Sequence, residues 1–93
     1  MITIKERIEQ HFHRLSKAQQ KVANVVLGNP AYISTHAAAE VGLMAGTSET
    51  TVIRFCYQIG LTGFAQLQKE VTAFLVEDYT NSTLGNYVSS KES

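Results

Sequence analysis

The feature that most constrains this chain is the short distance between two helix-forming segments on either side of Gly46. Residues 35–45, THAAAEVGLMA, form a helix-compatible run that stops at this glycine. Only Thr47 and Ser48 separate Gly46 from the next run, residues 49–59. Glycine adopts a left-handed backbone conformation without steric cost, and serine is a preferred N-cap. The chain is therefore predicted to turn sharply at Gly46 and to begin a new helix at once.

Helical periodicity also extends upstream of this turn. Residues 4–13 carry a narrow apolar stripe with a spacing of four, predicting a first helix. The tetrad Ser16 to Gln19 has the S-x-x-Q form of a capping box, so it predicts the start of a second helix. That helix is expected to end at Gly28-Asn29-Pro30, because these three residues are strong stop signals.

The segment downstream of residue 63 is predicted to form the longest helix. Its apolar residues recur at helical spacing, as Phe64, Leu67, Val71, Phe74 and Leu75. Since signals for strands are scarce, the predicted fold is all-α, a compact bundle of about five helices. After Asp78 the periodicity is lost, so residues 1–77 are expected to form the domain and residues 78–93 a tail or linker.

Composition places the chain among single soluble domains. It has 93 residues, enough for one core, of which 44% are hydrophobic and 17% charged. Its one cysteine, Cys56, excludes an internal disulfide and suits a reducing compartment. No apolar run approaches the ~20 residues that span a bilayer, so we expect a cytoplasmic protein without membrane contact.

The turn at Gly46 has the residue pattern of a helix-turn-helix, in which two short helices are joined by a glycine-containing turn. The first helix needs a small residue about one turn before the glycine, and Gly42 is there. The second helix needs apolar residues directed at the first. Val52 and Phe55 meet that requirement, six and nine positions after Gly46. Four matching positions at fixed spacing predict this motif.

At about 100° per residue, the segment 49–59 has two different faces. One is apolar and predicted to be buried: Val52, Phe55, Cys56 and Ile59. The other is polar: Thr50, Arg54 and Tyr57, flanked by Thr51 and Gln58. Threonine and arginine side chains recognise bases and phosphates, and the second helix of this motif enters the major groove at its N-terminal end. Ser48 and the free N–H groups beside it could hold a phosphate.

Two other interpretations of these features remain open. The polar face can be an ordinary solvated surface, or the chain can be a helical interaction or dimerisation module that uses residues 64–75 and binds no DNA. The formal net charge of zero favours such a module. However, residues 11–76 contain five basic and three acidic residues, a weak positive excess that suits a nucleic-acid partner.

Patterns for catalysis, metals or cofactors are lacking. His11 and His13 are two positions apart on a helix and so point in different directions, and no cysteine or carboxylate completes a metal set. Glu40 and Glu49 have no partner at catalytic spacing, and no phosphate-binding loop is present. Cys56 is expected to be a buried structural thiol. We therefore expect no enzyme, no metal site and no cofactor.

The run TSETTVIRFCYQIGLTGFAQLQKEV resembles the DNA-binding domain of RpiR-type bacterial transcription regulators. The similarity lies in a serine-capped helix with Val52-Ile53-Arg54-Phe55, then Ile59-Gly60, then Gly63-Phe64. Upstream, LSKAQQKVANVVLGNP is similar to the entry helix of that family. The resemblance covers roughly residues 4–77.

This resemblance implies a sequence-specific DNA-binding domain of a regulator of sugar or amino-sugar metabolism. Such regulators carry a C-terminal sugar-isomerase (SIS) domain that binds a phosphosugar effector, and residues 78–93 would lead toward it. A homodimer on a two-fold symmetric operator in double-stranded DNA is expected. Lys69 and Gln66 are candidates for phosphate contact. The residues expected to bind DNA are Ser48, Glu49, Thr50, Thr51, Arg54, Tyr57, Gln58 and Lys69.

Three departures from the family pattern affect these expectations. Gly42 replaces the usual alanine and is expected to loosen its helix, since glycine costs about 1 kcal/mol there. Thr47 stands where an aliphatic residue is usual. Tyr57 and Gln58 occupy positions where lysine or arginine is common, so fewer phosphate contacts and weak binding by a single domain are expected.

Overall fold

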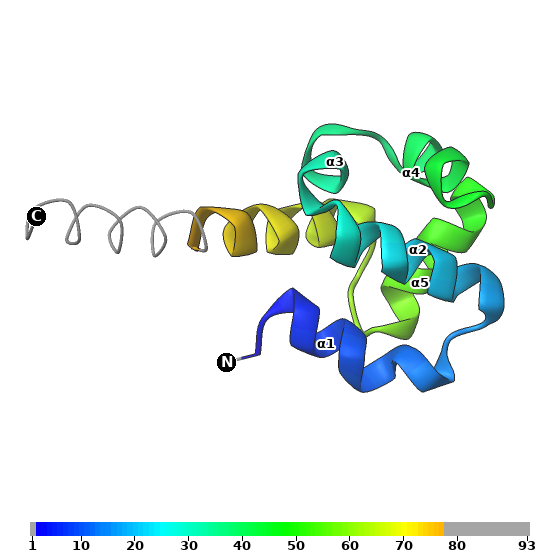
Figure 1. Ribbon diagram of the computed structural model, residues 1–93, viewed down its shortest axis with the longest axis horizontal. Helices are drawn as coiled ribbons and strands as arrows, with labels where there is room; N and C mark the ends of the chain where they lie inside the picture. Colours follow the sequence, from blue (N-terminus) through cyan, green and yellow to red (C-terminus); the bar gives the residue numbers. More distant parts are fainter. Residues whose placement is uncertain (1, 78–93) are drawn as a thin grey trace, which may run out of the picture.

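The computed structural model describes residues 2–77, and within that range the chain forms helices and no strand (Figure 1). The all-α prediction is therefore confirmed. The expected tail, residues 78–93, lies outside the described residues. The helices are α1 (Ile4–His11), the 3-10 helix η1 (Phe12–Arg14), α2 (Lys17–Gly28), α3 (Pro30–Thr35), α4 (Ala38–Ala45), α5 (Glu49–Gln58) and a C-terminal helix, residues 64–77.

Capping boxes begin the first two α-helices. The predicted box at α2 is confirmed, because the Ser16 hydroxyl accepts the Gln19 N–H at 3.1 Å and the Gln19 side chain accepts the Ser16 N–H at 3.2 Å. Thr3 and Glu6 form an equivalent box at α1, which the sequence analysis missed. Hydrogen bonds from the Thr3 backbone and side chain lower the pKa of the Glu6 carboxyl.

Helix α3 was not predicted, and the start of α4 was placed too early. Gly28 and Asn29 do end α2, but Pro30 opens a new helix because proline is well tolerated at the first helical position. His36 and Ala37 then have extended backbones, so α4 starts at Ala38 rather than near residue 35. The Glu40 carboxylate accepts the Ala37 N–H at 2.9 Å.

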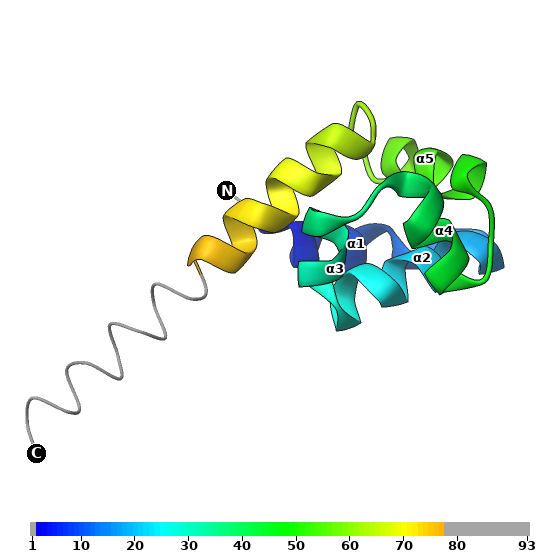
Figure 2. The same cartoon turned by 90° about the horizontal axis from the view of Figure 1, so that it is seen from above.

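The core lies where α2, α4 and α5 pack against one another. Side chains from all the α-helices enter it, and those with no exposed surface are Ile8, Val22, Ala23, Ile33, Val41, Val52, Phe55, Cys56, Ile59, Leu67 and Val71. The C-terminal helix begins near α5 and runs away from it (Figure 2). Gln68 ties that helix to α3 by donating to the carbonyls of Ile33 at 3.2 Å and His36 at 2.8 Å.

Candidate nucleic-acid interface

The turn between α4 and α5 has the tight geometry that the sequence predicted. Gly46 has a φ of +76° and ends α4. The Thr47 N–H bonds to the Gly42 carbonyl at 2.8 Å and the Gly46 N–H to the Leu43 carbonyl at 3.1 Å, which is a Schellman motif. Ser48 then caps α5. The left-handed glycine therefore turns the chain sharply between α4 and α5, as a helix-turn-helix requires.

The predicted small residue in α4 lies directly against the start of α5. A β-carbon added to Gly42 would lie 2.9 Å from the carbonyl carbon of Ser48 and 3.1 Å from the nitrogen of Glu49. These atoms belong to the backbone and cannot rotate away. Gly42 thus allows α4 to lie closer to α5 than an alanine would permit. This steric role is separate from the loosening of α4 that the low helix propensity of glycine predicts.

The apolar face of α5 is buried as predicted. Val52, Phe55 and Cys56, with Ile59 just after the helix, have no exposed surface. Burial raises the pKa of the Cys56 thiol to about 12, because desolvation disfavours the thiolate. Cys56 therefore has a structural environment and not that of a nucleophile.

The polar face of α5 points to solvent. Its exposed members are Ser48, Glu49, Thr50, Arg54, Tyr57 and Gln58, while Thr51 is half-buried. Tyr57 leaves 58% of its surface exposed, so its ring and hydroxyl are open to a partner. Seven of the eight predicted contact residues, counting the half-buried Thr51, therefore lie on α5 or at its N-cap.

Ser48 is already engaged at the N-terminus of α5. Its hydroxyl oxygen accepts the Thr51 N–H at 3.2 Å and lies 3.1 Å from the Thr51 hydroxyl. Its carbonyl accepts the Val52 N–H at 3.3 Å. Within the described residues, the N–H groups of Glu49 and Thr50 have no protein acceptor. A phosphate at this end would therefore meet those two N–H groups rather than the Ser48 side chain.

Lys69, the eighth predicted residue, belongs to a different helix. It is exposed on the C-terminal helix, and the helical spacing places it opposite the buried Leu67 and Val71. Gln66 has a capping role, because its side-chain oxygen accepts the Thr62 N–H at 2.8 Å and the Thr62 hydroxyl at 2.9 Å. Its oxygen is thus used within the domain.

Arg7, which was not among the predicted functional residues, contacts the other end of α5. Its Nη1 donates to the Ile59 carbonyl at 3.1 Å, across 52 residues of sequence. The one available signal was its place beside the stripe of Ile4 and Ile8, which turns its stem toward the bundle.

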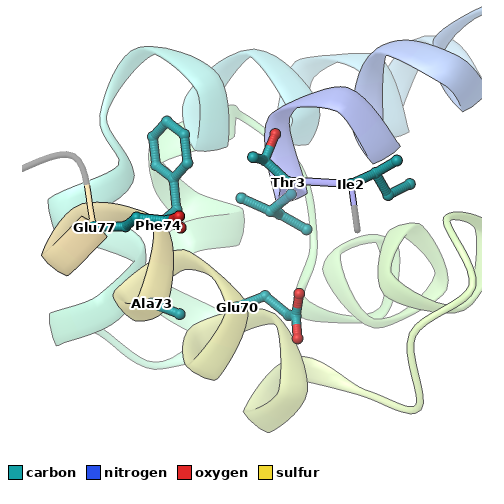
Figure 3. Close-up of a pocket in the computed structure, with 7 residues that line it drawn as sticks. Ile2, Thr3, Glu70, Ala73, Phe74 and Glu77 are labelled. Carbon is teal, nitrogen blue, oxygen red and sulfur yellow. The ribbon is translucent and has the colours of Figure 1, made fainter. Parts of the chain in front are cut away.

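A hollow of about 210 Å³ lies between the start of α1 and the C-terminal helix (Figure 3). Its lining is mixed, with apolar Ile2 and Phe74 and the carboxylates of Glu70 and Glu77. Among residues 2–77 no cluster of histidine, cysteine, aspartate or glutamate could hold a metal ion. No helix in the same range has the length and apolar character to span a membrane.

Comparison with known proteins identifies the kind of domain. The family model for the helix-turn-helix domain of the rpiR family matches residues 2–77. The chain is 31% identical to the HTH-type transcriptional regulator HexR of Pseudomonas aeruginosa, over the whole chain and 38% of that relative. It is 39% identical to HexR of Escherichia coli K12, over 63% of the chain and 20% of that relative. The chain therefore spans well under half the length of these relatives.

A solved structure has the same fold. The N-terminal domain of YbbH from Bacillus subtilis, an uncharacterized HTH-type transcriptional regulator, superposes with a TM-score of 0.69 at 29% sequence identity. The match covers 73% of this chain and 83% of the crystallised domain.

Proposed function

The chain belongs to the rpiR family of helix-turn-helix domains, which are DNA-binding domains of transcription regulators, and on this premise we propose that α5 reads operator DNA in the major groove. One observation carries this proposal. Directly after the turn at Gly46, α5 buries its apolar face completely and leaves its polar face open to solvent. Because α5 is anchored through its buried face, its exposed face can enter a DNA groove while the helix keeps its contacts with the core.

The polar face offers different chemistry along its length. Thr50 and Thr51 stand at the N-terminal end, which enters the groove first and can meet base edges or the thymine methyl. Arg54 lies one turn further, and no acidic side chain within residues 2–77 forms an ion pair with it, so its guanidinium is available to a guanine or a phosphate. Tyr57 and Gln58 would reach the DNA backbone at the groove edge.

Glu49 needs a separate assignment. Its carboxylate is exposed in the first turn of α5, where it stabilises the positive end of the helix dipole. A carboxylate would repel a phosphate but accepts a hydrogen bond from the amino group of cytosine. Its proposed role is therefore at a base or in stabilising the free helix, and not at the DNA backbone.

The structure weakens the interpretation as an interaction module without DNA binding. That interpretation uses the apolar stripe of the C-terminal helix, but Leu67 and Val71 are fully buried in the domain's own core. Phe64, Phe74 and Leu75 are also partly covered. Little of the stripe is left for another protein.

The wider activity follows from the family resemblance. We extend the proposal to a cytoplasmic homodimer on a two-fold operator, regulating sugar or amino-sugar metabolism. The phosphosugar effector would bind a domain outside these residues, as the family resemblance implies.

Selection of duplexes from a random genomic library by the purified chain tests the proposal. We expect enriched fragments with related half-sites, bound with an affinity that falls steeply as salt rises, because phosphate contacts release counterions. Self-association with little salt dependence and no enriched sequence would instead support the interaction module.

A further inference from the structure

Arg7 joins α1 to the C-terminal end of the helix assigned to DNA reading. Its Nη1 donates to the carbonyl of Ile59. Ile59 is the residue that caps the C-terminal end of α5, and it is fully buried. The guanidinium therefore sits at the negative end of the α5 dipole, where a cation is favourable. Helix α5 is thus held at both ends, by Ser48 at its start and by Arg7 at its finish.

The backbone hydrogen bonds that end α5 do not involve the Ile59 carbonyl, so this carbonyl can accept the bond from Arg7. The Leu61 N–H bonds to the Cys56 carbonyl at 2.9 Å and the Gly60 N–H to the Tyr57 carbonyl at 3.0 Å. This second Schellman motif satisfies carbonyls of the last turn. The Ile59 carbonyl takes part in neither of these two bonds and accepts one from Arg7.

Gly60 makes room for the guanidinium. It has a φ of +88°, and a β-carbon at this position would lie 3.1 Å from the Arg7 Nη1. Glycine here therefore permits both the backbone turn and the arginine contact.

The Arg7 side chain is held by its surroundings. Its Nε is buried and has no hydrogen-bond partner within the described residues. Burying an N–H group without a partner costs free energy, so the side chain would move into water unless packing and the Ile59 contact kept it in place. Such a cost is consistent with a role in fixing the position of α5.

We propose that Arg7 is a positioning residue for sequence recognition, an inference that rests on the DNA-reading function proposed above. Base contacts need hydrogen bonds of good geometry, whereas contacts to phosphates tolerate small displacements. Without Arg7, the C-terminal half of α5 would shift, moving Arg54 relative to the base edges. Recognition of the operator would then weaken more than binding to DNA of any sequence.

The test compares Arg7→Met with Lys5→Met. Methionine keeps an apolar stem of similar length but removes the charge and the donors, and Lys5 is an exposed cation on the same helix. Each variant is titrated with the duplex that the wild-type chain selects and with a random duplex. We expect Arg7→Met to lower the ratio of the two affinities by about tenfold, the size of one charge-assisted hydrogen bond, and Lys5→Met to leave it unchanged.

Amide hydrogen exchange in the free chain gives a readout that does not depend on DNA. Exchange of the Gly60 and Leu61 N–H groups should be about tenfold faster in Arg7→Met than in Lys5→Met, since the end of α5 has lost its anchor. If Arg7→Met is unfolded at the assay temperature, Arg7→Lys replaces it in both measurements. Lysine keeps the charge but has only one compact donor group. We therefore expect Arg7→Lys to lower the affinity ratio and to speed amide exchange, each by less than Arg7→Met would.

Three outcomes would overturn the inference. If the wild-type chain prefers its selected duplex and Arg7→Met keeps the same preference, only the positioning role fails. If Arg7→Met weakens both duplexes equally and lowers the salt slope by about one, Arg7 contacts a phosphate instead. If the wild-type chain prefers no duplex, the proposed function itself fails, and the inference fails with it.

Discussion

Gly42 and Ser48 meet backbone to backbone where α4 crosses the start of α5. A methyl group on Gly42 would come within 2.9 Å of the Ser48 carbonyl carbon and 3.0 Å of its carbonyl oxygen. Contacts this short with backbone atoms can be relieved only by moving one helix away from the other. The crossing that presents α5 to solvent therefore depends on the absence of a side chain at residue 42.

Gly42→Ala is expected to lower the free energy of unfolding. Alanine gains about 1 kcal/mol in helix propensity, but overpacking against fixed backbone costs about 1–3 kcal/mol, so the net loss is about 1 kcal/mol. Urea denaturation measures it. Gly28→Ala is the matched control because a β-carbon there meets nothing within 4 Å. A variant at residue 42 that is as stable as the one at residue 28 would show that the helices separate easily.

Arg54→Ala is expected to weaken binding to the selected operator by about 1–3 kcal/mol and to relax the preference at one base pair. The reason is that its exposed guanidinium occupies the middle of the polar face of α5. Fluorescence titration against operators with single base-pair changes measures both effects, with Lys5→Ala as the charge control. Equal weakening at every sequence would contradict base reading and assign Arg54 to a phosphate.

Lys69→Ala tests the one predicted contact on the C-terminal helix. If Lys69 binds a phosphate, its removal lowers the slope of log affinity against log salt by about one, without changing the preferred sequence. This is the expected result, measured by titration at several salt concentrations. An unchanged slope would restrict the interface to the surface formed by α5 and Ser48.

Burial of Cys56 predicts a loss of stability at alkaline pH. Its pKa is raised to about 12 in the folded chain, whereas an unfolded thiol has a pKa of about 8.5. The unfolded state alone therefore ionises as pH rises above about 8.5, and the stabilisation from burying the neutral thiol is progressively lost up to about pH 12. The urea midpoint should therefore decrease between about pH 7 and about pH 10, and the decrease should be larger for the wild-type chain than for Cys56→Ala.

The same burial predicts slow chemistry at this thiol. Near pH 8, an aromatic disulfide reagent should modify Cys56 in the folded chain far more slowly than in urea, because the thiolate is disfavoured and the sulfur is covered. Equal rates in the two states would show that α5 opens readily from the core.

Local sequence signals predicted much of this domain. Ser16 with Gln19 marked the start of α2, and Gly46 with Ser48 marked the turn before α5. The spacing of Val52, Phe55, Cys56 and Ile59 separated the buried from the exposed face of α5. These signals succeed because capping, left-handed turns and helical periodicity depend on residues within a few positions of one another.

One local signal was interpreted too narrowly. Pro30 follows a glycine and an asparagine and so predicts the end of a helix, although proline also begins helices. Whether a proline ends one helix or begins the next depends on the packing of the residues that follow it. Here Ile33 enters the core and stabilises α3.

Contacts between distant segments could not be predicted in this way. Arg7 meets Ile59 and Gln68 meets His36 only because the helices pack at particular angles and depths. Sequence periodicity specifies which face of a helix is buried but not how far one helix slides or tilts against the next. That placement results from the packing of all the core side chains together, and it sets the direction in which α5 presents its polar face.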